Sequence, residues 1–168
     1  MIAINEVAPD FKLPDLKGNL HTLSDHHGKV VIVNFWSCEC PHAERTDKLI
    51  LGWLKEWGGE VELLSLASNQ NESAQSVGEA ARNRGIPMVL IDAGHEVADL
   101  YEAVTTPHVF VMDKEGVLRY MGAVDDVTFR QRTATRFFLK EAVDSLLEGH
   151  FPALAETPAY GCSIVREI

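Results

Sequence analysis

The residues of this 168-residue chain best suited to chemistry are its three cysteines. Cys38 and Cys40 are separated by a single residue, and Cys162 lies close to the C-terminus. A cysteine in its thiolate form attacks disulfides and peroxides. Three cysteines are too few for a disulfide scaffold, and an odd count leaves at least one thiol unpaired in a monomer. In a reducing compartment, the placement of these cysteines favours a reactive or metal-binding role.

Cys40 is followed by Pro41 at the point where a β-branched run ends. Proline suits the first helical turn, which puts Cys40 at or next to the helix N-cap. The unpaired N–H groups and the helix dipole there favour thiolate, so we expect the pKa of Cys40 to lie below the free value of about 8.5. A protonated His42 would strengthen this effect, and Glu39 and Glu44 would oppose it.

Two other interpretations of the cysteines remain open. A cysteine after a strand is often a small buried hydrophobe. Alternatively, Cys38, Cys40, His42 and Cys162 supply soft ligands suited to zinc or copper(I). The Cys-x-Cys spacing is tighter than that of structural zinc sites, and no second ligand pair matches it. We therefore expect no bound metal and no cofactor, and keep a metal-handling module as the alternative.

The composition indicates an ordinary globular protein. Apolar residues make up 46% and charged residues 24%, and the net charge is −10. Such a charge disfavours nucleic acid and anionic membranes as partners. The first residues lack a signal-peptide pattern, and no apolar run is long enough to span a membrane. We predict a cytoplasmic protein with one domain over residues 1–168, in which 149–168 form a C-terminal tail.

The chain reads as alternating strands and helices. Apolar runs with almost no polar break predict strands buried on both faces, and helical periodicity ending at glycine predicts helices. The expected elements are a hairpin at a sheet edge within 8–23, strands at 30–36, 61–67 and 88–91, helices at 41–57, 73–84, 97–101 and 133–148, and a hairpin over 109–121. This order predicts an α/β fold, with a mixed central sheet and helices on both faces.

A few further residues carry weaker expectations. Most histidines are scattered and read as surface residues, but His108 follows Thr106-Pro107 and is expected near the thiols. Trp36 is expected to form the core or a wall of the site. The pair Asp125-Asp126 reads as part of a solvated loop.

Several segments resemble one family in combination. The run 30–37 leading to Cys40-Pro41 resembles the active-site entry of thioredoxin-fold proteins, and Thr106-Pro107 followed by 109–116 resembles their cis-proline strand and hairpin. The opening segment 8–15 resembles the redoxin and alkyl hydroperoxide reductase/thiol-specific-antioxidant branch. The segment 157–164 resembles the end of a peroxiredoxin-like subgroup that has Gly-Cys-Ser-Ile near its C-terminus.

The resemblance implies a thioredoxin-like fold with an N-terminal hairpin extension. It implies a thiol-disulfide oxidoreductase or weak thiol-dependent peroxidase, with Cys40 as the nucleophile and Cys38 or Cys162 as the resolving thiol. Trp36, Thr106 and Pro107 would bind substrate, with the Thr106–Pro107 bond cis. The partners would be a thioredoxin- or glutathione-like thiol donor and a disulfide or peroxide substrate.

The sequence also departs from the family patterns. Ala43 stands where thioredoxin has its second cysteine. Ser37 matches the Thr or Ser that precedes the peroxiredoxin nucleophile, but Val33 replaces an upstream proline and Thr106-Pro107 lies where an arginine is expected. The metal-handling alternative resembles Sco-type copper chaperones, which have wider cysteine spacing and a distal histidine.

Cys162 is predicted to be a redox partner of the Cys38/Cys40 turn. A bond between Cys38 and Cys40 would close a very small, strained ring through one residue. The tail is long enough for Cys162 to reach across the domain. The sequence leaves open the oligomeric state, the electron donor and which pair of cysteines forms the disulfide.

Overall fold

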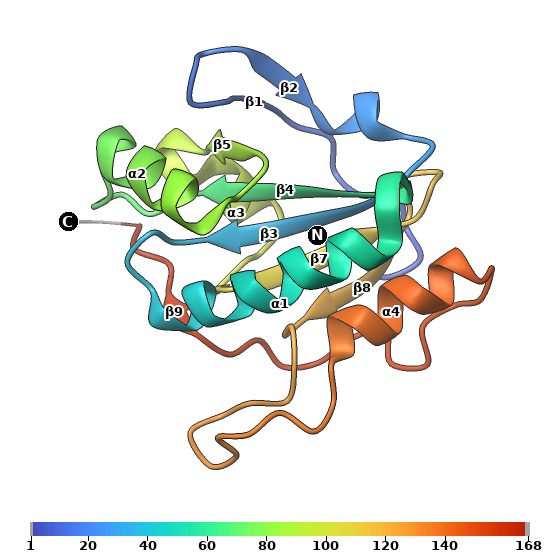
Figure 1. The fold of residues 1–168 in the computed structure, drawn as a ribbon. Coiled ribbons are helices and arrows are strands. Elements are labelled where there is room, and N and C mark those ends of the chain that lie inside the picture. The colour runs from blue at the N-terminus through green and yellow to red at the C-terminus, as the bar shows by residue number, and fades with distance from the viewer. Residues whose placement is uncertain (1, 167–168) are drawn as a thin grey trace.

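A five-stranded sheet forms the centre of the computed structural model, which describes residues 2–166 (Figure 1). Its middle strand β3 (Val30–Trp36) runs parallel to β4 (Val61–Ala67), and β4 runs parallel to β5 (Val89–Ile91). On the other side, β7 (His108–Met112) is antiparallel to β3 and to β8 (Leu118–Gly122). Residues 1, 167 and 168, at the ends of the predicted domain and tail, lie outside the described residues.

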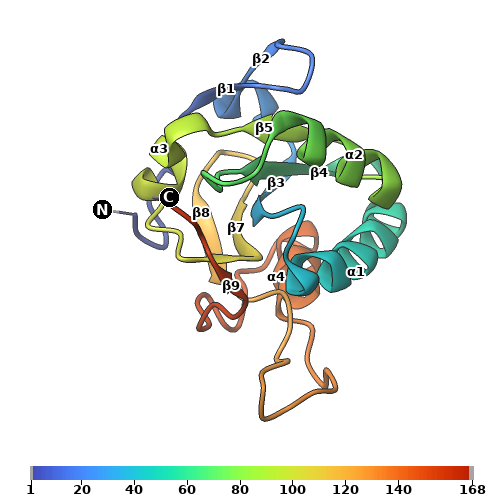
Figure 2. The same ribbon diagram turned by 90° about the vertical axis from the view of Figure 1, so that its left-hand side faces the viewer.

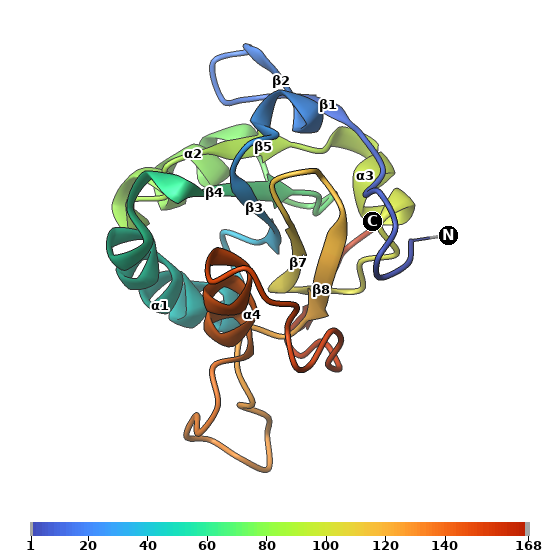
Figure 3. The ribbon, with the colours of Figure 1, turned by 90° about the vertical axis from the view of Figure 1, so that its right-hand side faces the viewer.

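Helices cover both faces of this sheet, which confirms the predicted α/β class. The helices are α1 (Pro41–Trp57), α2 (Ala74–Arg84), α3 (Glu96–Leu100) and α4 (Phe138–Leu147). Figures 2 and 3 show α1 beside α4, while α3 lies across the sheet from them. Because β3 is covered on both faces, all seven of its residues are buried. Val31, Val33 and Phe35 pack in the apolar cluster on one face, and its other apolar side chains pack in two clusters on the opposite face.

Local sequence signals set the helix ends. Cys40 is the N-cap of α1 and Pro41 is its first residue, as predicted from the Cys-Pro pair. Helix α1 ends at Gly58, whose φ of 65° favours glycine. The Ser73 side chain caps α2 by accepting a hydrogen bond from the Ser76 backbone N–H.

Two small sheets flank the central one. The hairpin β1 (Lys12–Pro14) and β2 (Leu20–Thr22) is present as predicted, but it forms a sheet of its own that meets the edge strand β5 through one bridge, from Asp15 to Leu90. Strand β6 (Thr105–Thr106) pairs with β9 (Cys162–Ser163), which the sequence patterns did not predict. Short 3₁₀ turns cover Leu23–His26, Gly58–Glu60 and Ala93–His95.

The structure corrects two predictions in the segment before α4. The last helix begins at Phe138 and not at residue 133, because the Thr135 backbone N–H and hydroxyl both donate to the Asp126 carboxylate and hold this stretch in a loop. Asp125 is not solvated, since its side chain is only 3% exposed and accepts two hydrogen bonds from Arg45, at 2.7 and 3.1 Å.

Candidate active site

Cys40 and Cys162 are joined in a disulfide that links the start of α1 to β9. The two residues are 122 positions apart in the chain, and their Cα atoms are 6.2 Å apart. Cys40 is buried, whereas Cys162 is partly exposed. Cys38 is the free cysteine. The structure therefore contains the predicted disulfide to the tail and not a bond between Cys38 and Cys40. The low pKa expected for the Cys40 thiol concerns the reduced protein and stays a prediction.

The disulfide lies against the cis-proline segment. The Thr106–Pro107 peptide bond is cis, which confirms the prediction made from the resemblance. Cys40 Sγ lies 3.2 Å from the carbonyl oxygen of Thr106, and Cys162 is the β-sheet partner of Thr106. Thr106 and Pro107 are both buried beneath this arrangement. The nucleophile candidate, the proline edge and the tail cysteine thus meet at one point.

Backbone hydrogen bonds hold the end of the tail in place. The Ile164 N–H donates to the Val104 carbonyl at 3.1 Å, which continues the β6–β9 pairing. The Val165 N–H donates to Asn69 Oδ1 at 2.7 Å, and the Gln70 N–H donates to the Val165 carbonyl at 2.8 Å. The tail is therefore clamped between β6 and the loop after β4.

Cys38 is bound to Glu72, which the sequence analysis did not single out. The Cys38 thiol and backbone N–H both donate to Glu72 Oε1 at 3.1 Å. The other oxygen, Oε2, accepts from the Ser37 hydroxyl at 2.5 Å and from Asn69 Nδ2 at 2.6 Å. Burial, reinforced by Glu72, raises the pKa of Cys38 to about 12. Cys38 is thus a protonated, weakly nucleophilic thiol at neutral pH.

Replacing Glu72 by Gln is expected to make Cys38 more reactive. A glutamine at this position would carry no charge to repel a thiolate, although burial would still oppose ionisation. We expect alkylation of Cys38 by iodoacetamide, measured by mass spectrometry on the oxidised protein at pH 8, to accelerate by about tenfold. Glu79→Gln on the exposed face of α2 serves as the control and should leave the rate unchanged. Equal rates in Glu72→Gln and the wild type would contradict this assignment.

Arg84 holds the other side of the cysteine turn. Its guanidinium donates to the carbonyls of Cys38 at 2.6 Å and Ser37 at 3.1 Å, and to Asp47 Oδ2 at 3.2 Å. The same Asp47 oxygen accepts from Trp36 Nε1 at 2.7 Å. Trp36 is fully buried. In the oxidised protein it therefore packs beneath the cysteine turn and has no surface that a substrate could contact.

Asp47 gives the site a measurable pH signature. Burial raises its pKa to about 6, against the lowering effects of Trp36 and Arg84. The folded protein therefore keeps this proton to higher pH than the unfolded chain does, and the stability from this group is lost as the pH rises from about 4 to 6. We expect the free energy of unfolding of the wild type, relative to Asp47→Asn, to fall by roughly 2–3 kcal/mol between pH 4 and 7. Urea titrations at each pH measure this difference, and parallel curves for the two proteins would contradict it.

His108 does not lie with the thiols, which corrects the expectation from the sequence. Its ring packs against Phe110, with ring centroids 4.6 Å apart, and its neighbour across the strands is Phe35. Side chains alternate along β3, so Phe35 and Trp36 face opposite sides of the sheet, and His108 lies on the Phe35 side. Burial lowers the pKa of His108 to about 4, so it is neutral at pH 7.

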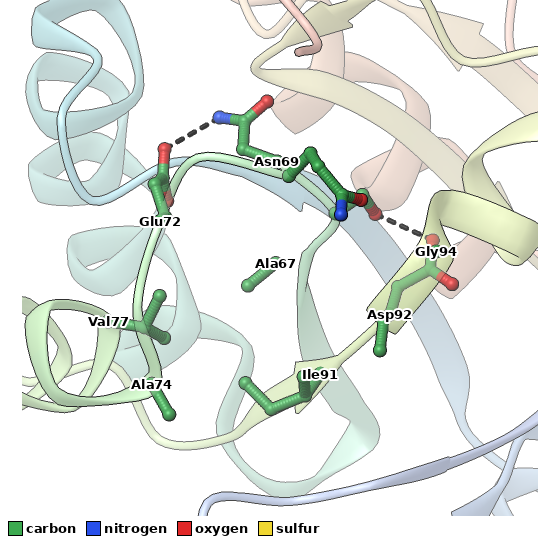
Figure 4. Close-up of a pocket in the computed structure, with 11 residues that line it drawn as sticks. Ala67, Asn69, Glu72, Ala74, Val77, Ile91, Asp92 and Gly94 are labelled. Atoms are coloured by element: carbon green, nitrogen blue, oxygen red, sulfur yellow. Dashed lines mark hydrogen bonds between the residues drawn. The ribbon is translucent and has the colours of Figure 1, made fainter. Parts of the chain in front are cut away.

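A cavity of about 170 Å³ adjoins the cysteine turn, at the carboxyl ends of β4 and β5 (Figure 4). Glu72 and Asn69 lie on its wall and are hydrogen-bonded to each other. Asp92, on the opposite wall, accepts from the Ser68 hydroxyl at 2.7 Å and from two backbone N–H groups at the start of α3. The side chains of Glu72, Asn69 and Asp92 are thus all hydrogen-bonded to other parts of the protein.

The described residues contain no cluster of three or more His, Cys, Asp and Glu side chains arranged to hold a metal ion. Within residues 2–166, no helix combines the length and the apolar character needed to cross a bilayer.

A model of the AhpC/TSA family matches residues 4–121, which include β1 to β7, Cys38, Cys40 and the cis-proline. The chain belongs to the AhpC/TSA family. Its fold is the thioredoxin-like redoxin fold. The family match ends before Cys162.

Relatives of this AhpC/TSA protein include thiol-disulfide oxidoreductases. It is 35% identical over 122 residues to the thiol-disulfide oxidoreductase ResA of Geobacillus kaustophilus, an alignment that covers 70% of this chain and 68% of the relative. The corresponding Bacillus subtilis protein is 30% identical over 111 residues, covering 65% of this chain and 61% of the relative. A hypothetical protein from Sinorhizobium meliloti 1021 has a similar structure, with a TM-score of 0.87 and 30% identity over 98% of this chain and 94% of that one.

Proposed function

We propose that this ResA-related redoxin is a thiol-disulfide oxidoreductase whose redox couple is Cys40 and Cys162. The main support is that the cysteine at the N-cap of α1 is bonded to the cysteine of β9, directly beside the cis-proline edge. We also assign the chain to the peroxiredoxin-like subgroup with Gly-Cys-Ser-Ile near the C-terminus, on the basis of residues 161–164.

In the reducing direction, the Cys40 thiolate attacks one sulfur of a client disulfide. A mixed disulfide forms, and the client's second sulfur leaves as a thiolate and takes up a proton. The Cys162 thiolate then attacks Cys40 Sγ, which releases the client's first thiol. Two electrons pass to the client, and the Cys40–Cys162 disulfide remains.

The exposure of the two sulfurs favours a defined route for re-reduction. Cys162 is partly exposed while Cys40 is 3% exposed, so a donor thiolate reaches Cys162 Sγ more readily. Cys40 then leaves as a thiolate at the start of α1, where the helix dipole stabilises it. A second thiol of the donor completes the step, which suits a dithiol protein of the thioredoxin type or two glutathione molecules.

Reduction of peroxides is a less suitable use of this site. The Ser37 hydroxyl, which matches a peroxiredoxin position, donates to Glu72. Arg84 binds the carbonyls of Ser37 and Cys38, and Arg45 binds Asp125. These donors are committed to the structure, so we expect disulfides to oxidise the reduced protein faster than equimolar hydrogen peroxide does.

Turnover and disulfide mapping test the proposal together. The reduced protein is given insulin as the disulfide substrate and dithiothreitol as the donor, and the oxidised protein is digested and mapped by mass spectrometry. We expect insulin reduction above the dithiothreitol background and a Cys40–Cys162 linked peptide, with Cys38 free. Absence of turnover, or a Cys38–Cys40 pair alone, would contradict the proposal.

A further inference from the structure

We propose that the C-terminal strand occupies the client-binding edge, and that its sequence is a template for the client. The client would be an extended segment with glycine before its reactive cysteine and a large aliphatic residue two positions after it. This inference rests on the proposed function, because it identifies the substrate class of the same site. The template positions in the chain are Gly161, Cys162 and Ile164.

Gly161 is restricted by the backbone of the cis-proline segment. A Cβ atom added to Gly161 would overlap the Thr106 carbonyl oxygen, and it would lie 2.7 Å from the Thr106 carbonyl carbon and 3.1 Å from Pro107 Cδ. The nearest two are backbone atoms of a buried residue, so they cannot move aside as a flexible side chain would. A chain seated in this register therefore needs glycine before its cysteine.

The position two residues after the cysteine is the apolar anchor. Ile164 is 6% exposed and belongs to the core cluster that contains Tyr101, Ala103 and Phe110. Ser163, between the cysteine and the anchor, is exposed, so this position does not require an apolar side chain. The pattern of one inward and one outward residue is that of a strand added to a sheet edge.

Most of the hydrogen bonds next to the template come from the tail backbone, and the Arg166 side chain adds contacts to the Asp99 carboxylate and the Ala103 carbonyl outside the three template positions. Ile164 and Val165 are held through backbone groups by Val104, Asn69 and Gln70. Any extended chain can make these hydrogen bonds, so a client segment can replace the tail without a new set of partners. While the tail is seated, these groups and the β6 edge are occupied.

The cycle then becomes an exchange of strands. In the reduced protein no covalent bond holds the tail, so a client segment can take its place beside Thr106 and form a mixed disulfide with Cys40. When the tail returns to the edge, the Cys162 thiolate attacks Cys40 Sγ and the client leaves as a thiol. Tail docking and resolution of the mixed disulfide are thus one event.

Two peptides and one glycine variant test this inference. Reduced full-length Cys162→Ser is mixed with the peptide Ala-Tyr-Gly-Cys-Ser-Ile-Val-Arg, activated as a thionitrobenzoate disulfide, and with the same peptide carrying Ala in place of Gly. We expect the glycine peptide to form the mixed disulfide with Cys40 at least about tenfold faster, because the Ala Cβ would meet the Thr106 backbone.

Adding Gly161→Ala to Cys162→Ser should unseat the competing tail and accelerate the reaction with the glycine peptide severalfold. Gly59→Ala is the matched control, because a Cβ there meets no atom within 4 Å, and it should change nothing. A small aromatic disulfide that needs no strand docking is run in parallel. If Cys40 reacts with it but treats both peptides equally, or if Gly161→Ala has no effect, this inference is overturned while the proposed function stands. If Cys40 reacts with none of the three disulfides, the proposed function itself fails.

Discussion

Replacing Cys40 by Ser is expected to lower the rate of insulin reduction more than about a thousandfold, to the background of the donor alone. Cys40 is the thiol placed at the N-cap of α1 and beside the Thr106 carbonyl, so we expect it to be the group that forms the mixed disulfide. Cys38→Ser is expected to keep the rate within about threefold, because Cys38 is held protonated by burial and Glu72.

Cys162→Ser separates the two halves of the reaction and serves as the control. Without the Cys162 thiol the first attack still occurs, so a mixed disulfide between Cys40 and the client should accumulate and be visible by mass spectrometry. Full activity in Cys162→Ser together with loss of activity in Cys38→Ser would show that Cys38 resolves the intermediate, contrary to our assignment.

Reduction of the Cys40–Cys162 disulfide is expected to lower the free energy of unfolding by about 5 kcal/mol. The bond joins residues 122 positions apart, and a cross-link that closes a loop of roughly this length restricts the unfolded chain by about that amount in the chain-entropy model. Urea unfolding with and without a phosphine reductant measures the difference. The oxidised protein should show the higher midpoint.

The cysteine variants make this stability prediction specific. Cys162→Ser should unfold like the reduced wild type and should not respond to the reductant, whereas Cys38→Ser should respond as the wild type does. A response of Cys162→Ser to the reductant as large as that of the wild type would mean that another disulfide stabilises the fold.

The sequence by itself predicted the order and type of nearly all the elements of the central sheet. Strands 30–36 and 61–67 have the bounds expected from their predominantly apolar runs, because burial on both faces leaves few polar positions. The start of α1 followed from Cys40-Pro41, since the fixed φ of proline favours the first helical turn. These signals act over a few neighbouring residues, so they can be read along the chain.

The start of α4 shows how tertiary contacts override such local signals. Apolar spacing predicted a helix from residue 133, but hydrogen bonds from Thr135 to Asp126 hold five residues in a loop. Asp125 looked like a solvated loop residue and is instead buried against Arg45. Thr135 lies nine positions from Asp126, and Arg45 lies 80 positions from Asp125. The spacing of apolar residues therefore could not predict either contact.

Only the tertiary structure decided the chemistry of the three cysteines. The sequence left open whether Cys38 or Cys162 pairs with Cys40, because the answer depends on where β9 meets β6. The raised pKa of Cys38 comes first from burial and then from Glu72, which lies 34 positions away on a different loop. Residue types and spacing were enough to predict that the Cys40 thiol lies at the start of a helix. The environment of each thiol was decided by segments that meet only in the folded chain, since burial and charge act through space and not along the sequence.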